Sequence, residues 1–141
     1  METPDVNVLV RAYRADSVGH TAAEKWFADT LASGGVVPIA ELALSALIRI
    51  GSHPGSAKIP LDKPRLLSFA DAIATHPNVE LVSPRERHWE IFLSLCHRPG
   101  VHGKVVPDAY YAAIAIERGL TFVTADRGFA RFPGLDWRLI E

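Results

Sequence analysis

The sequence has little cysteine and almost no net charge. Cys96 is the only cysteine among 141 residues, which excludes a disulfide framework and any zinc site built on paired cysteines. Lysine and arginine number 15 against 16 acidic residues, a formal net charge of -1. A chain with this balance binds nucleic acid only through the local placement of its charges, because its net charge exerts no attraction on a polyanion.

Long apolar segments are also missing. The longest, residues 36–50, is interrupted by a proline and two charged residues, whereas a membrane-spanning helix needs about 20 apolar residues. The opening residues 1–5 contain two acids and none of the basic residues that begin a secretion signal. We therefore expect no membrane segment and a cytoplasmic location.

Several common catalytic and cofactor motifs are absent from the sequence. It contains neither Gly-x-Gly-x-x-Gly nor Gly-x-x-x-x-Gly-Lys-Ser/Thr, so nothing supports dinucleotide or P-loop binding. No pair of the six histidines has the spacing of four with a carboxylate between them. No serine has a convincing His-Asp pair to activate it, so a serine hydrolase is not supported either.

Short apolar runs alternate with helical patterns along the whole chain. With 48% hydrophobic residues and no break in composition, residues 1–141 are predicted to form a single domain. Strands alternating with helices favour a three-layer α/β/α sandwich with a mainly parallel central sheet. The predicted strands are residues 1–4, 36–38, 79–82, 120–123 and 137–140. The predicted helical segments are residues 6–16, 21–32, 39–50, 63–76, 86–97, 108–118 and 127–131, with a loop over 52–60.

Four carboxylates stand out because each lies where a predicted strand gives way to a helix. They are Asp5, Glu41, Asp108 and Asp126. Each one alone is explained as a helix cap or as a first-turn acid that interacts favourably with the helix dipole. As a set they predict a site, because the carboxyl ends of parallel strands lie at one edge of the sheet and ligands bind there.

Four carboxylates within a few ångströms repel one another unless cations neutralise them. Oxygen ligands without cysteine favour Mg²⁺, with Mn²⁺ as the other choice. A cation bound in this way activates water for attack on a phosphodiester, and a second cation, where present, stabilises the leaving oxygen. The pattern therefore predicts a metal-dependent hydrolase with no covalent nucleophile.

Four sequence segments resemble the PIN domain, and more closely the VapC-type toxins of bacterial toxin–antitoxin pairs. The resemblance covers nearly the whole chain and agrees in order and spacing. It rests on Asp5-Val6-Asn7-Val8-Leu9-Val10, Glu41-Leu42, Pro107-Asp108-Ala109-Tyr110-Tyr111-Ala112-Ala113-Ile114-Ala115 and Thr124-Ala125-Asp126-Arg127-Gly128-Phe129-Ala130-Arg131-Phe132.

The resemblance implies a Mg²⁺- or Mn²⁺-dependent ribonuclease with Asp5, Glu41, Asp108 and Asp126 as its acidic cluster. It also implies that Asn7 and Thr124 support the cluster. The implied partners are an RNA substrate, a VapB-type antitoxin and a second copy of the chain in a homodimer. Gly128 departs from the family pattern, since many members have a further acid there, and this leaves open whether one or two cations bind.

Basic residues near the predicted acids are candidates for contacts with RNA phosphates. They are Arg98, His102 and Lys104 before Asp108, and Arg127 and Arg131 after Asp126. Arg11 and Arg14 are interpreted more simply as part of a solvated helix face. A separate apolar face is expected to be covered partly by a second copy or by an antitoxin helix; it comprises Trp26, Leu31, Leu42, Leu47 and Ile50.

A non-catalytic PIN-like module is the alternative hypothesis. In such a module the acids would hold only arginines of a partner, or RNA without cleavage. The presence of all four acids favours the enzyme, whereas Gly128 favours the module.

Overall fold

A computed structural model describes residues 1–55 and 60–140. Five parallel strands form the centre: β1 (Glu2–Pro4), β2 (Val37–Ala40), β3 (Val79–Val82), β4 (Thr121–Thr124) and β5 (Trp137–Leu139). They pair as β1-β4-β5 and β2-β3, and β1 lies beside β2. The two sheets lie side by side, so the strands follow the spatial order 3-2-1-4-5 with β1 in the middle, although among the described residues no strand pairing joins β1 to β2.

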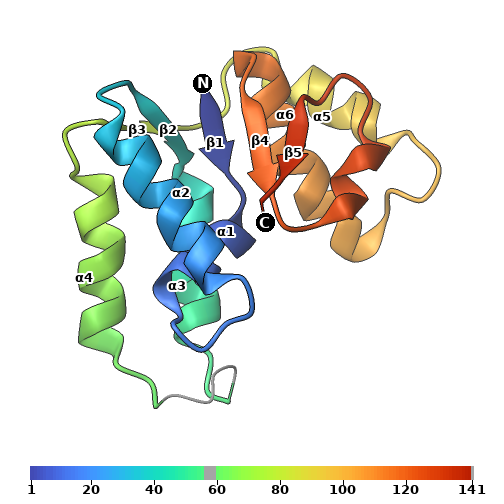
Figure 1. The fold of residues 1–141 in the computed structure, drawn as a ribbon. Coiled ribbons are helices and arrows are strands. Elements are labelled where there is room, and N and C mark those ends of the chain that lie inside the picture. The colour runs from blue at the N-terminus through green and yellow to red at the C-terminus, as the bar shows by residue number, and fades with distance from the viewer. Residues whose placement is uncertain (56–59, 141) are drawn as a thin grey trace.

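Helices cover the strands in two groups (Figure 1). The first comprises α1 (Val6–Tyr13), α2 (His20–Ala32), α3 (Glu41–Gly51) and α4 (Lys63–Ala74). The second comprises α5 (His88–Cys96) and α6 (Val106–Arg118), with the short 3-10 helices η1 (Gly103–Val105) and η2 (Arg127–Arg131). Each group packs on its own buried cluster, the first around Leu9, Ile39 and Leu47, the second around Ala112 and Phe129. This is the predicted α/β/α arrangement.

The first strand is short but fully engaged in the sheet. Its residues pair in register with β4, Pro4 opposite Val123, and the backbone N–H of Asp5 donates to the Val123 carbonyl over 2.8 Å. The prediction of a strand at residues 1–4 is confirmed although the segment is not apolar. Thr3 and Pro4 are buried because β1 lies between two neighbouring strands.

Several predicted boundaries differ from the structure. The helix expected over residues 39–50 begins at Glu41, because residues 39 and 40 complete β2. The helix expected at 108–118 begins at Val106, with Pro107 in its first turn, where a missing N–H costs nothing. The helix expected to reach residue 16 ends at Tyr13. Residues 56–59 of the predicted loop over 52–60 lie outside the described residues.

The predicted partner face is mostly part of the chain's own core. Trp26 and Leu47 are buried, Leu31 and Ile50 are half-buried, and Leu42 alone of the five is exposed, at 46%. The prediction was wrong for Trp26 and Leu47, because α1–α4 pack on one another and consume the apolar surface that the sequence showed. Among the described residues, no helix is long and apolar enough to span a membrane.

Candidate active site

The order of the strands creates a site at the carboxyl ends of β1 and β4. From β1 the chain moves outward to β2 and β3 on one side, then crosses to β4 and β5 on the other. The segment that follows β1 and the segment that follows β4 lead away in opposite directions from the place where these two strands end side by side. Open parallel sheets bind ligands at such a place. Asp5 follows β1 and Asp126 follows β4 by two residues.

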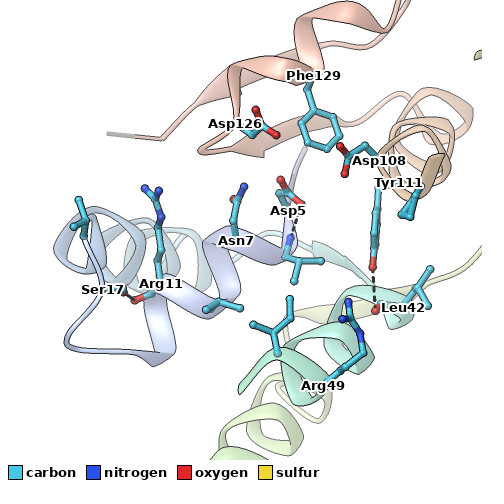
Figure 2. A pocket seen from close by; sticks show the side chains of 15 residues that line it. Asp5, Asn7, Arg11, Ser17, Leu42, Arg49, Asp108, Tyr111, Asp126 and Phe129 are labelled. Carbon is cyan, nitrogen blue, oxygen red and sulfur yellow. Dashed lines mark hydrogen bonds between the residues drawn. The ribbon is translucent and has the colours of Figure 1, made fainter. Parts of the chain in front are cut away.

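Three aspartates line one cavity of about 690 Å³ at this point. Asp5 comes from the junction of β1 and α1, Asp108 from the first turn of α6, and Asp126 from the junction of β4 and η2. In Figure 2 they approach from three different segments, with the Phe129 ring between Asp126 and Asp108. Residues more than 100 positions apart in the sequence are thus brought to one cavity.

Asp5 and Asp126 also cap helices, as their positions predict. Oδ1 of Asp5 accepts from the N–H of Val6 over 2.6 Å, and Oδ1 of Asp126 accepts from the N–H of Gly128 over 2.7 Å. Each cap uses one carboxylate oxygen. Each of these acids can therefore be a helix cap and a site residue at once. The hydrogen bond of a cap orients the carboxylate but does not neutralise its charge.

A buried hydrogen-bond network joins the two strand ends. Thr124, fully buried, donates its hydroxyl to Oδ2 of Asp5 over 2.6 Å, and its oxygen accepts from the Asp126 N–H and from Nδ2 of Asn7. Oδ1 of Asn7 in turn accepts from the N–H of Ala125. Asn7 and Thr124 thus occupy supporting positions between Asp5 and Asp126.

The acids raise one another's proton affinity. Asp5 is only 6% exposed, and burial is the main cause that raises its pKa to about 6, against the opposing hydrogen bonds from Thr124 and Val6. The charges of Asp108 and Asp126 raise it further. Burial, and then the charge of Asp126, also raise the pKa of Asp108. Negative charge is therefore concentrated here beyond what the protein itself neutralises.

Glu41 does not line this cavity. It is the exposed first residue of α3 and lines an adjoining depression of about 310 Å³ with Ser45, Val82 and Tyr110. Its neighbour Leu42 lines both hollows. Within residues 1–55 and 60–140, no three His, Cys, Asp or Glu side chains stand close enough together to hold a metal ion as they are.

The donor chemistry of the cavity nevertheless suits a hard divalent cation. Its three aspartates, supported by Asn7 and Thr124, offer oxygen atoms and no sulfur, the set that Mg²⁺ and Mn²⁺ prefer. Burial raises the pKa of Asp5 and the charges of Asp108 and Asp126 raise it further, so a cation bound beside it would favour its ionised form. The residues present therefore fit such an ion in their chemistry.

The cavity wall includes three residues that the sequence did not indicate as site residues. Arg11 from α1 and Arg49 from α3 line it on different sides, and Tyr111 spans it, donating its hydroxyl to the Leu42 carbonyl over 3.2 Å (Figure 2). Burial raises the pKa of Tyr111 to about 12, with Asp5 as a further cause. Arg11 lies four residues after Asn7, so helical spacing alone places both on one face.

The basic residues predicted to contact RNA lie outside the cavity lining. Arg98, His102 and Lys104 are exposed on the segment that leads into α6, and Arg127 is exposed on η2. Arg131, also on η2, folds back toward Asp126, as its Nε donates to the Gly128 carbonyl over 2.9 Å.

The sequence pattern of the PIN domain matches residues 3–135. Ribonuclease VapC25 of Mycobacterium tuberculosis is 32% identical over 131 residues, which is 93% of this chain and 92% of the relative. Ribonuclease VapC43 of the same organism is 35% identical over 135 residues, 95% of this chain and 91% of the relative.

Solved structures share the fold at lower sequence identity. A chain in the crystal structure of VapBC2 from Rickettsia felis, bound to a DNA fragment from their promoter, matches with a TM-score of 0.72 at 19% identity. That match covers 99% of this chain and 98% of the other. With the family pattern over most of its length and relatives above 30% identity, this chain belongs to the PIN domain family, among the VapC ribonucleases.

Proposed function

We propose that this chain is a toxin ribonuclease that hydrolyses RNA phosphodiesters with Mg²⁺, or Mn²⁺, held by Asp5, Asp108 and Asp126. The observation that carries the proposal is the convergence of these three aspartates on one cavity, where burial and mutual repulsion raise the pKa of Asp5 to about 6. Glu41 is a proposed fourth ligand, and its exposed position in the adjoining depression calls for a separate test.

The bound cation would supply activation of water and neutralisation of charge that develops on the phosphate. The chain's own residues do the rest. Thr124 and Asn7 fix the orientation of Asp5 relative to Asp126 through their hydrogen bonds. Asp108 lines the cavity and forms no hydrogen bond or ion pair through its side chain in the described part of the chain, so both its oxygens are available to a ligand.

Arg11 and Arg49 are the proposed contacts for the RNA backbone on either side of the acids. Both line the aspartate cavity and present guanidinium groups, which bind phosphate oxygens in pairs. The chain has almost no net charge, so its attraction for RNA must come from such local placement. We keep Arg98, His102, Lys104 and Arg127 as further proposed contacts with a longer RNA beyond the cavity.

The proposed protein partners are a VapB-type antitoxin and a second copy of this chain. Support comes from the VapBC assemblies among the structures of similar fold. It comes also from apolar side chains that the fold leaves exposed, such as Leu81 on β3 and Trp89 on α5. A cytoplasmic location remains a prediction from the sequence.

A non-catalytic binding module is the competing function. It is favoured by the position of Glu41 outside the cavity and by the spacing of the acids, which do not form a ready metal site among the described residues. In that case the cavity would bind cationic groups of a partner and no RNA would be cut.

Incubation of total cellular RNA with the purified chain distinguishes the two functions. Cleavage in Mg²⁺ or Mn²⁺ that stops in EDTA, with discrete ends on mapping, supports the ribonuclease. Intact RNA in both metals, at protein concentrations where the chain is folded and binds RNA, supports the module instead.

A further inference from the structure

Gly128 is held between Asp126 and Arg131. Its N–H donates to Oδ1 of Asp126 over 2.7 Å, and its carbonyl accepts from Nε of Arg131 over 2.9 Å. Both side chains therefore fold over the same short turn of η2. The arginine is five residues from Asp126 in sequence but is fixed beside it in space.

The missing side chain at residue 128 is what permits this approach. A Cβ placed there would lie 3.0 Å from Oδ1 of Asp126 and 3.4 Å from Nη2 of Arg131. Gly128 does not need a left-handed backbone, since its φ is not positive. The glycine therefore leaves room for an acid and a guanidinium over its Cα: an added Cβ would crowd the Asp126 carboxylate and would stand at van der Waals distance from Nη2 of Arg131.

The positive charge of Arg131 acts on the acids of the site, although Arg131 forms no ion pair with any of them in the described part of the chain. Its positive charge lowers the pKa of Asp108, against burial and Asp126. Within the part of the chain that the structure describes, Arg131 forms no ion pair, and its single hydrogen bond uses Nε. Nη1 and Nη2 remain available at the edge of the acidic site, and Arg131 is exposed to a ligand there.

Formal charges show what such a guanidinium contributes. Three ionised aspartates and one divalent cation leave a net charge of about -1, which repels an incoming phosphodiester. One guanidinium at the rim brings that sum to about zero. Its planar fork also matches two phosphate oxygens, so it orients as well as attracts.

We propose that Arg131 binds the non-bridging oxygens of the phosphodiester to be cleaved, and that Gly128, by leaving room over its Cα, lets Arg131 and Asp126 stand together at that phosphate. This inference rests on the proposed ribonuclease function and assigns a phosphate-binding residue within it. Arg131 would thereby place a fixed positive charge next to the bound cation, at the turn where Gly128 stands in place of a further acid.

The phosphate contact can be tested without cleavage by measuring RNA binding in EDTA. The Kd of a short single-stranded RNA is measured by fluorescence anisotropy over a range of KCl concentrations. Arg131→Gln should reduce the slope of log Kd against log salt concentration by about 0.7, the effect of losing one phosphate contact on a single strand. Lys25→Gln is the matched control, because it removes the same charge from α2, which contributes no residue to the cavity lining. Its slope should equal that of the wild type.

Cleavage kinetics supply the second readout. In Mg²⁺, Arg131→Gln should lower kcat/KM by about 10- to 100-fold, and Arg131→Lys should restore the salt slope but only part of kcat/KM, since lysine keeps the charge without the fork. Should Arg131→Gln fail to fold, Arg131→Lys decides. An Arg131→Lys enzyme with wild-type kcat/KM would overturn the proposed bidentate contact.

Gly128→Ala tests the packing requirement and should lower kcat/KM while the free energy of unfolding changes by less than about 1 kcal/mol. Ala130→Ser, an addition of one atom on the exposed side of the same turn, should leave both unchanged. A wild type that cuts no RNA in either metal defeats the ribonuclease itself. A wild type that cuts RNA, with an Arg131→Gln variant of unchanged salt slope and kcat/KM, defeats only the role of Arg131.

Discussion

The hydroxyl of Thr124 donates a 2.6 Å hydrogen bond to Oδ2 of Asp5, across 119 residues of sequence. Both residues are buried at the ends of neighbouring parallel strands. The bond lowers the pKa of Asp5, although burial still raises it overall. It joins the two halves of the acidic site.

Thr124→Val should destabilise the protein and disturb the site, whereas Thr124→Ser should do little of either. Valine leaves Oδ2 of Asp5 and the N–H of Asp126 without their partner, which costs about 1–3 kcal/mol. Serine keeps the hydroxyl and loses one methyl group, about 0.8 kcal/mol. Urea unfolding measures the difference, and a valine variant as stable and as active as the serine variant would show that the bond has no role.

The stability of the metal-free protein should fall as pH rises from about 4 to 7. Because the pKa of Asp5 is raised from 3.8 to about 6 on folding, the folded state binds more protons in this window, and deprotonation of Asp5 disfavours folding. The cost at pH 7 is on the order of 3 kcal/mol. Asp5→Asn should flatten the pH dependence of the free energy of unfolding in EDTA. An unchanged slope in the variant would contradict the assignment.

Divalent cations should stabilise the folded protein at neutral pH, because they bind the folded site and not the unfolded chain. A free concentration about 100 times Kd contributes about 2.7 kcal/mol. Thermal unfolding with Mg²⁺, compared with NaCl of equal ionic strength, should show a higher Tm at pH 7. The increase should shrink near pH 5, where Asp5 is protonated and no longer a ligand. Equal Tm values with both salts at pH 7 would argue against a cation at the three aspartates.

Arg49→Gln should weaken RNA binding while the chemical step stays nearly intact. The side chain lines the cavity wall opposite the acids and is exposed, so its loss removes a backbone contact and little packing. We expect KM to rise several-fold and kcat to change by less than about two-fold. This is the pattern for a lost contact that binds the substrate and the transition state equally well. A large fall in kcat with KM unchanged would place Arg49 in the chemistry instead.

The sequence predicted the site residues at strand ends better than it predicted the helical residues that line the cavity. Asn7 and Thr124 were implied by the family resemblance alone, whereas Asp5 and Asp126 were found because each follows a predicted strand, and parallel strands must end at one edge of the sheet. Their positions depend only on the order of the strands. Asp108 was expected at a strand-to-helix junction as well, but the 3-10 helix η1 precedes α6, so Asp108 reaches the cavity from the first turn of a helix and not from a strand end.

Whether a helical residue lines the cavity depends on the angles at which the helices pack, and the periodicity of the sequence does not determine these angles. Arg11 was interpreted as part of a solvated face, yet it lines the cavity because α1 turns that face toward the carboxyl ends of β1 and β4. Glu41 follows β2 as predicted, but it lines the adjoining depression. Successive helical residues point about 100° apart, and it is Leu42 that lines the cavity with the aspartates.

The replacement of Asp108 by asparagine tests the central claim most directly. The Asp108 side chain makes no hydrogen bond or ion pair within residues 1–55 and 60–140, so Asp108→Asn removes a charge and almost nothing else. RNA cleavage in Mg²⁺ should fall by more than about 100-fold, because even an outer-shell partner of a metal ligand is worth about 10- to 100-fold. The free energy of unfolding in EDTA should hold steady or rise, since repulsion with Asp126 is relieved. Wild-type cleavage by the Asp108→Asn protein, with a divalent cation still required, would contradict the account.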